Sequence, residues 1–343
     1  MIDKHKLTYN SIAKNMDESN KDVLPWIEKY RPKSLDEIVS HKDIVTSMEN
    51  FIKDDSLPHI LFFGPPGTGK TSIIKAAISK IYGVDKGIMV LDLNASEERG
   101  IDIVRGRIKK FVTSEISFTH NKNYKFKLVI LDEIDSMTDD AQRILRKIIE
   151  ENTKNARFCL ICNYINKINP ALRSRCLSFK FTPLQKNRIK KRVQYIIEEE
   201  KIDIDDKAVD TLIERSAGDM RKVLNILQST SIMTNKIVSD TINNCVGYPI
   251  DEQVKYIIDL LVNSKNRTNT TKLLVEYIRE NSLSLHDIIL EAHNYLINNL
   301  DKYDQEKLII LFDKLKFIDI NLSHNPNIKL DIVALSYEFS LLD

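Results

Sequence analysis

Short apolar segments alternate with amphipathic ones through the first half of the chain. The segments "HILFF", "GIMVLDLNAS", "FKLVILD" and "ARFCLICNY" are apolar enough to be buried strands. Helical periodicity follows the first three, over about residues 70–83, 98–112 and 139–152. Strands that alternate with amphipathic helices are typical of a parallel sheet with helices on both faces. We therefore predict an α/β fold for this half of the chain.

The strand signal disappears after Pro183, and helical spacing takes its place. Three short helices are predicted over residues 183–201, 205–218 and 219–232. From about Tyr248 apolar residues recur at i, i+3, i+4 and i+7, as in Val254, Ile257, Ile258 and Leu261. The predicted organisation is a polar N-terminal extension (1–24), an α/β domain (25–182), a small helical domain (183–247) and an all-α domain (248–343).

Composition limits the class of protein. Of the 343 residues, 42% are hydrophobic and 29% are charged, as in an ordinary soluble globular protein. No run approaches the roughly 20 apolar residues of a membrane span, and the N-terminus lacks the apolar core of a signal peptide. We therefore expect an intracellular protein without a membrane partner. The net charge of +2 is too small to indicate nucleic-acid binding by itself.

Two cysteines have the spacing of a metal or redox pair. Cys159 and Cys162 are separated by two residues, but no second pair follows at ligand spacing. Both lie in a predicted strand, where residues three apart point to opposite faces. Two buried thiols are therefore a better explanation than zinc.

The strongest chemical signal is "GPPGTGKT", which matches G-x-x-x-x-G-K-[ST] between a predicted strand and a predicted helix. Its glycines allow backbone N–H groups to surround phosphate groups at the N-terminus of the helix. Lys70 would reach the β- and γ-phosphates of a nucleotide, and the Thr71 hydroxyl would bind Mg²⁺. A chance glycine-rich turn is the alternative, and the strand–loop–helix context argues against it.

The segment "LVILDE" favours an ATPase among the proteins that share such a loop. Asp132 ends the apolar run and can hold Mg²⁺ directly or through water, and Glu133 can polarise the attacking water as a base. A GTPase would carry an N-K-x-D tetrapeptide, which is not visible in this chain. The alternative is an acidic strand end that caps the next helix.

Three further polar residues are candidates for the same chemistry. Asn163 ends the fourth strand, where strand ends line the ligand crevice of such folds, so its amide can contact the γ-phosphate or the attacking water. Arg221 lies in the first turn of a predicted helix, although an isolated arginine there is usually just solvated. Arg175, in "RSRC", follows Asn163 by twelve residues and need not point into its own phosphate-binding loop.

The segment "ERGIDIVRGRIKKF" and the helix after "LVILDE" carry basic residues that could contact DNA phosphates. The candidates are Arg99, Arg105, Lys109 and Arg146. Arg105 and Lys109 would share one face of an α-helix because they are four residues apart. On the residues alone, a solvated basic face is the preferred explanation.

These motifs together resemble the AAA+ ATPases, and more narrowly the small subunits of replication factor C. The resemblance covers about residues 25–247. It rests on "PWIEKYRPKSLDEIV", "GPPGTGKTS", "LDLNASEERGIDIVR", "LVILDEIDSMT", "AQRILR", "RFCLICNY", "SRC" and "GDMRKVLN". The departures are mild: Glu97 and Glu98 replace the usual aspartate pair, and Arg173 stands where glutamine is more usual. The helices after Tyr248 agree with the family's collar domain in length and class only.

The resemblance implies an ATP-driven subunit of a hetero-pentameric clamp loader, which opens a ring-shaped sliding clamp and places it on primer–template DNA. It implies that Ile27 and Val39 flank the adenine and that Asn163 and Arg221 sense the γ-phosphate. The phosphate-binding residues that it implies are Gly64, Pro65, Pro66, Gly67, Thr68, Gly69, Lys70, Thr71 and Ser72. The resemblance also makes DNA contact the preferred explanation for the basic residues listed above. It implies that residues 183–247 correspond to the family's lid domain.

An assembly of this kind uses heterologous interfaces, in which one face of a subunit meets a different face of the next. We therefore expect Arg175 to act on the ATP of a neighbouring subunit. Two alternatives are an AAA+ DNA motor of the branch-migration helicase type and a scaffold that binds ATP without hydrolysing it. The expected location is the nucleus, or a replication site in the host cytoplasm if the chain is from a large DNA virus.

Overall fold

The computed structural model of the chain describes residues 24–38, 40–97, 104–114, 124–263, 266–324 and 327–339. The chain divides into two compact units. The first contains the residues up to Ile202 together with Leu212–Gln228, and the second contains Asp203–Thr211 and the chain from Ser229 onward. This border passes through the predicted lid domain, and the domain limits at residues 183 and 248 stay predictions.

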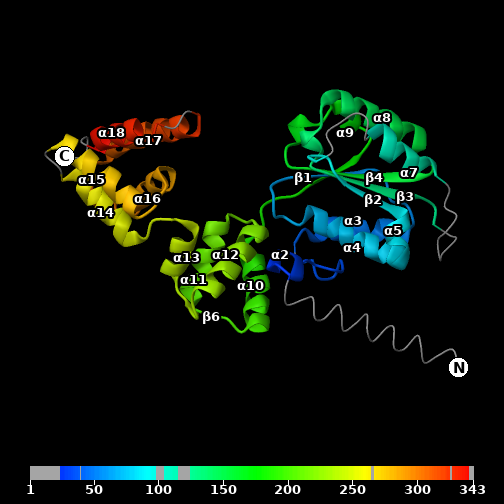
Figure 1. Ribbon diagram of the computed structural model, residues 1–343, viewed down its shortest axis with the longest axis horizontal. Coiled ribbons are helices and arrows are strands. Elements are labelled where there is room, and N and C mark those ends of the chain that lie inside the picture. The colour runs from blue at the N-terminus through cyan, green and yellow to red at the C-terminus, as the bar shows by residue number, and fades with distance from the viewer. Residues whose placement is uncertain are drawn as a thin grey trace. The chain divides into compact units, whose positions relative to one another are not determined.

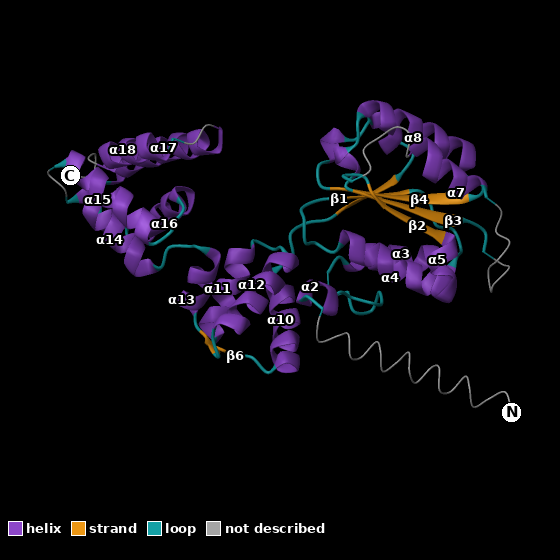
Figure 2. Ribbon diagram, in the orientation of Figure 1, coloured by secondary structure: helices purple, strands orange, loops and turns teal. Residues whose placement is uncertain are grey.

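A five-stranded parallel sheet forms the centre of the first unit (Figure 2). The strands are β1 (Ile60–Phe63), β2 (Val90–Asn94), β3 (Lys127–Asp132), β4 (Ala156–Cys162) and β5 (Leu177–Lys180). Their order in space is β2-β3-β4-β1-β5, and every pair is parallel. Because β1, β3 and β4 lie inside the sheet, nearly all of their residues are buried, which explains the apolar runs in the sequence.

The fifth strand was missing from the sequence-based prediction, which contained four. β5 lies at the edge of the sheet and pairs only with β1, from Ile60 beside Leu177 to Phe63 beside Lys180. Three of its four residues are exposed, so it carries no buried apolar run that would identify it. Short edge strands with a charged residue are common because they discourage pairing with other chains.

Helices cover both faces of this sheet (Figure 1). On one face lie α3 (Lys42–Lys53), α4 (Lys70–Tyr82) and α5 (Lys86–Met89), and on the other lie α7 (Lys109–Thr113), α8 (Asp139–Asn152) and α9 (Pro170–Arg173). Each face has its own apolar core. Cys159 belongs to one core and Cys162 to the other, so the two thiols are buried on opposite sides of β4 as expected.

The helix predicted from about residue 98 to 112 differs from the prediction where the structure describes it. Residues 98–103 lie outside the described residues. Val104–Ile108 form a π-helical turn, and α-helix follows only over Lys109–Thr113. The side chain of Arg105 lies outside the described residues, so the shared face of Arg105 and Lys109 stays a prediction.

Helices follow the sheet, as the periodicity after Pro183 predicts. They begin with α10 (Lys186–Glu200), α11 (Asp206–Ser216) and α12 (Met220–Met233), and the second unit adds α13 (Ser239–Val246). Two strands of two residues each, β6 (Asp203–Ile204) and β7 (Lys236–Ile237), pair in parallel within the second unit. They are too short to leave a periodic pattern, which is why the sequence showed no strand after Pro183.

The C-terminal part of the second unit is helical. It contains α14 (Asp251–Val262), α15 (Arg267–Glu280), α16 (Leu285–Asn298), α17 (Gln305–His324) and α18 (Ile328–Glu338). The predicted apolar stripe of α14 is buried at all four of its positions, within one apolar core that these helices share. No helix among the described residues combines the length and the apolarity that crossing a membrane requires.

Candidate functional site

One cleft collects most of the residues that the sequence marks as chemical. It lies where β3 and β4 end, between the loop that follows β1, a short N-terminal helix α2 (Trp26–Lys29) and the helices α10 and α12. Its empty space is about 1160 Å³ when the solvent at its open mouth is included. The predicted residues that line it are Ile27, Pro66, Gly67, Thr68, Gly69, Lys70, Thr71, Ser72, Asp132, Glu133, Asn163 and Arg221.

The loop after β1 has a backbone that requires glycine at two positions. Gly64 has φ 141°, and a Cβ there would lie 2.2 Å from the Phe181 carbonyl oxygen. Gly67 has φ 66°, and a Cβ there would lie 1.6 Å from Oδ1 of Asp219, at the start of α12. Without side chains, both residues let the loop pass close to neighbouring elements before Gly69 begins α4. This is the conformation expected of a loop that presents backbone N–H groups to phosphates.

Lys70 is buried and points back across this loop. Its Nζ donates hydrogen bonds to the carbonyl oxygens of Gly64 (2.7 Å) and Pro65 (2.8 Å) and to Oδ1 of Asn163 (2.9 Å). Burial lowers the pKa of Lys70, the nearby Asp132 raises it, and Arg221 lowers it further. The ammonium group therefore lies at the floor of the cleft between the phosphate-binding loop and the end of β4.

Thr71 and Asp132 supply a pair of oxygen ligands beside Lys70. The Thr71 hydroxyl donates to Oδ2 of Asp132 at 2.8 Å. Mg²⁺ prefers hard oxygen donors, and it commonly binds one or two protein oxygens while phosphates and water complete its shell. The two side chains fit such an ion when a nucleotide is bound. No group of three or more His, Cys, Asp or Glu side chains among the described residues forms a separate metal site.

Glu133 follows Asp132 in a left-handed backbone conformation. Its φ is 57°, and its N–H donates to Oδ1 of Asp132 at 2.9 Å. A non-glycine residue in this region is strained, and such strain is concentrated at functional sites. The conformation turns the chain sharply at the end of β3, and Glu133 lines the cleft with its side chain exposed.

Asp135 fixes the position of Asn163, which sequence reasoning missed. Its Oδ2 accepts hydrogen bonds from the backbone N–H groups of Asn163 (3.2 Å) and Tyr164 (3.1 Å). These bonds join the segment after β3 to the end of β4. Because the backbone of Asn163 is held in this way, its side-chain amide stays beside Lys70.

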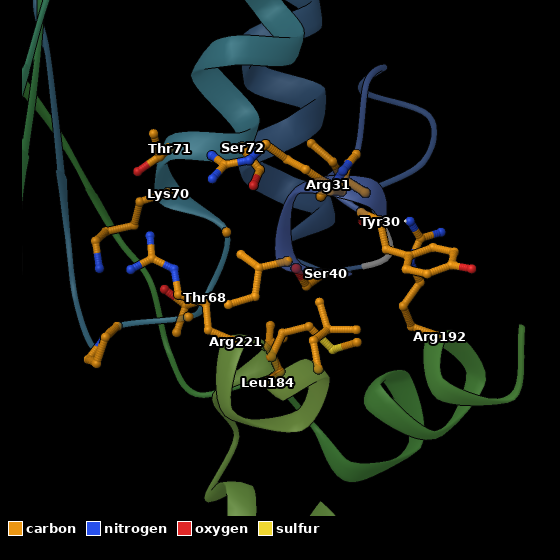
Figure 3. Close-up of a pocket in the computed structure, with 18 of the residues that line it drawn as sticks. Tyr30, Arg31, Ser40, Thr68, Lys70, Thr71, Ser72, Leu184, Arg192 and Arg221 are labelled. Atoms are coloured by element: carbon orange, nitrogen blue, oxygen red, sulfur yellow. Dashed lines mark hydrogen bonds between the residues drawn. The ribbon is translucent and has the colours of Figure 1, made fainter. Parts of the chain in front are cut away.

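Arg221 lies at the same end of the cleft as Lys70 and Thr68 (Figure 3). It is in the first turn of α12, where Oδ1 of Asp219 accepts from its N–H at 2.8 Å and caps the helix. The N–H of Met220 donates to the Gly67 carbonyl at 3.2 Å, which ties α12 to the phosphate-binding loop. Two cations that line the same end of a cleft form a binding site suited to phosphate.

The other end of the cleft has a mixed lining, in which apolar side chains lie beside polar and cationic ones. Ile27, Ile38, Leu184, Met220 and Leu224 line it, whereas Val39 lies outside the described residues. Apolar side chains beside a phosphate cradle suit a flat aromatic base.

Sequence reasoning missed several other lining residues at this end, where Figure 3 shows Tyr30 and Arg192. Nη2 of Arg192 donates to the Tyr30 carbonyl at 3.0 Å, and the Tyr30 hydroxyl donates to Oε1 of Glu200. Ser40, Arg188 and Ile189 also line the cleft. The only available signal was the spacing of Arg188 and Arg192 on one helix face.

Arg175 does not line this cleft. It lies between α9 and β5, where its Nε pairs with Oε1 of Glu150 on α8 and its Nη1 donates to the Ala171 carbonyl at 2.7 Å. Its side chain is 33% exposed, so an approaching molecule can reach it. Arg175 is absent from the described lining of the cleft, and its role toward a neighbouring subunit stays a prediction.

The candidate DNA-binding residues are only partly described. Arg99 lies outside the described residues, and so does the side chain of Arg105. Lys109 is exposed at the start of α7. Arg146 is 39% exposed on α8, where its Nε pairs with Glu150 at 3.0 Å. Contact with DNA by these residues stays a prediction.

Family models match the chain along most of its length. The model for the "ATPase family associated with various cellular activities" matches residues 60–184. The "RFC1-like, AAA+ ATPase lid domain" matches residues 186–244, and the "Replication factor C C-terminal domain" matches residues 249–337.

Two eukaryotic proteins illustrate the similarity over the full chain. Replication factor C subunit 5 of Homo sapiens is 44% identical over 93% of this chain and 92% of its own length. Replication factor C subunit 3 of Saccharomyces cerevisiae is 39% identical over 92% of this chain and 93% of its own length.

Solved structures show a likeness of fold. The Thermotoga maritima RuvB Holliday junction branch migration motor covers 77% of this chain and 91% of its own chain, with a TM-score of 0.51 and 17% identity. At that level of identity the likeness concerns the fold alone.

Proposed function

Because this chain belongs to the replication factor C family, as a small subunit of the clamp loader in DNA replication, we propose that it binds and hydrolyses ATP with Mg²⁺ in the cleft described above. The observation that carries the proposal is the convergence of Lys70, Asn163 and Arg221 on one end of that cleft. An ammonium group, an amide and a guanidinium group line that end, beside the Thr71 and Asp132 oxygens that suit Mg²⁺.

ATP would exchange the internal bonds of Lys70 for bonds to phosphate. In the structure two carbonyl oxygens and the Asn163 amide oxygen accept hydrogen bonds from the ammonium group. A β- or γ-phosphate offers an anionic acceptor in their place, so Lys70 would gain an ion pair in addition to the hydrogen bond. The adenine would lie at the other end of the cleft, against Ile27 and Leu224.

Hydrolysis requires a water molecule placed in line with the γ-phosphate. Glu133 lines the cleft as the general base, and Asn163 orients the water or the γ-phosphate from the end of β4. Mg²⁺, held by Thr71 and Asp132, would neutralise charge on the phosphates. Arg221 moves with α12, so its contact with the γ-phosphate would report to the lid whether ATP is bound.

We further propose that Arg175 completes the site of an adjacent subunit. It lies outside its own cleft and is accessible on the surface. An arginine offered in trans neutralises charge that develops on the transferred phosphoryl group, an effect of about 10³- to 10⁵-fold in rate in enzymes with such fingers. The partners would be the other subunits of a hetero-pentamer, the sliding clamp and primer–template DNA.

The alternatives receive less support. Likeness to a branch migration motor is restricted to the fold, while the family models over the lid and C-terminal helices belong to replication factor C. A scaffold that only binds ATP would not need Glu133 beside an intact magnesium-binding pair. The place of action would be a site of DNA replication, in the nucleus or in a viral replication compartment.

Purification of the tagged full chain from its native host or virus tests this function. We expect four related AAA+ chains and a ring-shaped clamp to be recovered with it, and the complex to hydrolyse ATP faster when primer–template DNA and the clamp are added. A Lys70→Ala chain is the control and should lose ATP binding. Recovery of a closed hexamer of this chain alone, or of a complex without a clamp, would contradict the proposal.

A further inference from the structure

Three charged residues form a linked group on the outer side of the sheet. Glu150, near the end of α8, uses the same carboxylate oxygen to pair with Nε of Arg146 and Nε of Arg175. Arg146 is one helical turn before Glu150, whereas Arg175 arrives from the segment between α9 and β5. The carboxylate therefore connects the start of β5 to a long helix that packs on the sheet core.

This contact fixes one edge of the Arg175 guanidinium. Nε is engaged by Glu150, and Nη1 donates to the Ala171 carbonyl at 2.7 Å and lies 3.4 Å from the Ser174 hydroxyl. Arginine has five N–H donors in a planar fork. Nη2 has no hydrogen bond to an acceptor among the described residues other than Glu150. One of its donors shares the Nε edge that faces Glu150, and the other points away from it and is available to an incoming anion.

We propose that Glu150 is the positioning residue for Arg175, holding the inner edge of its guanidinium so that the outer donors are aligned for the γ-phosphate of an adjacent subunit. This inference rests on the proposed role of Arg175 in trans. Arg146 contributes by fixing the Glu150 carboxylate from the other side.

The effect expected is one of pre-organisation. A free arginine side chain must give up rotamer freedom when it binds, at a cost equivalent to about 2- to 10-fold in affinity or rate. If Glu150 has already restricted the side chain, that cost is met before the adjacent site reaches its transition state. The pKa of Glu150 is held below its usual value by Arg146 and Arg175, so the carboxylate is ionised at neutral pH.

Exposed ion pairs contribute little to folding stability. Removal of the Glu150 charge should therefore leave the unfolding transition of the chain unchanged while it slows hydrolysis at the neighbouring site. If the ion pair has no role beyond its own weak contact, its removal would change neither the unfolding transition nor the rate of hydrolysis at the neighbouring site. A folding defect would move both.

The test uses the full complex. Every ATP site except the one that Arg175 completes has its phosphate-loop lysine replaced by alanine, so that only that site can hydrolyse ATP. Single-turnover hydrolysis is compared for the wild-type chain, Glu150→Gln, Arg175→Ala and the double variant. Glu151→Gln is the matched control, because it removes the same charge from an adjacent exposed position with no ion pair among the described residues.

We expect Glu150→Gln to lower the single-turnover rate constant at saturating ATP by about 2- to 10-fold, with the ATP concentration for half-maximal rate changed by less than 2-fold. In the Arg175→Ala background the same change should have no effect, because Glu150 acts only through Arg175. Equal rates for Glu150→Gln and Glu151→Gln, or an undiminished effect in the double variant, would overturn the inference. Normal hydrolysis in Arg175→Ala would instead show that the trans role itself is wrong.

Discussion

Asp135 offers a sharp test of how the site is built, because its carboxylate contacts the backbone of the segment that carries Asn163. Its carboxylate accepts two backbone N–H bonds, from Asn163 and Tyr164. Replacement by alanine would leave Asn163 attached to the site only through its side chain. We expect Asp135→Ala to lower kcat for ATP hydrolysis strongly and to leave ATP affinity almost unchanged.

The magnitude follows from the two hydrogen bonds. A hydrogen bond to a charged group contributes about 1.5–3 kcal/mol, so the two bonds together would contribute about 3–6 kcal/mol. Because both donors are partly exposed, we take half of that combined value, about 1.5–3 kcal/mol. If this loss falls on the transition state, kcat decreases by about 10- to 100-fold. Asp135→Asn keeps a neutral acceptor and should lower kcat by at most about 10-fold.

Pre-steady-state hydrolysis in the assembled complex, together with nucleotide titration, separates kcat from affinity. Asp139→Ala serves as the control, since it removes the same charge from an exposed position at the start of α8. A folded Asp135→Ala chain whose kcat lies within 2-fold of the Asp139→Ala value would refute the idea that this carboxylate positions Asn163.

Two further predictions concern the pH dependence of stability and the salt dependence of DNA binding. Burial lowers the pKa of His59 from 6.5 to about 4, and its Nδ1 accepts from the Phe158 N–H. Because the unfolded chain binds the proton more readily, stability should be complete above pH 6.5 and fall by up to about 3 kcal/mol as the pH drops to 4. His59→Gln should flatten that pH dependence in urea titrations, and an unchanged profile would contradict it. The complex carrying Arg105→Ala with Lys109→Ala should bind primer–template DNA more weakly, with the slope of log K against log salt reduced by about 2; an unchanged slope would exclude phosphate contacts there.

Local patterns predicted the features that depend on a few adjacent residues. The inner strands are buried on both faces, so their apolar runs are visible in the sequence. The loop from Gly64 to Thr71 carries its own glycine spacing, and Asp132 follows directly from a strand. These motifs determine where Lys70, Asp132 and Asn163 meet, because parallel strands end at the same edge of a sheet.

Features that depend on distant partners could not be predicted in this way. The exposed edge strand β5 leaves no buried pattern, and the spacing of the residues before α7 does not distinguish the π turn from an α-helix. Asp135 contacts Asn163 across 28 positions, and Glu150 meets Arg175 across an intervening strand and helix. Nothing in the residues near Glu150 indicates that an arginine from another element will reach it.

The central claim is that this chain binds ATP in its own cleft and completes the site of its neighbour. Hydrolysis and nucleotide binding, measured site by site in the assembled complex, test it with two variants. Arg175→Ala should leave ATP binding by this chain unchanged and slow hydrolysis at the adjacent subunit by about 10³-fold or more, whereas Lys70→Ala should abolish binding at this chain's own cleft. Arg173→Ala, two residues away and exposed, is the control. If Arg175→Ala instead impaired only this chain's own cleft, the account would be contradicted.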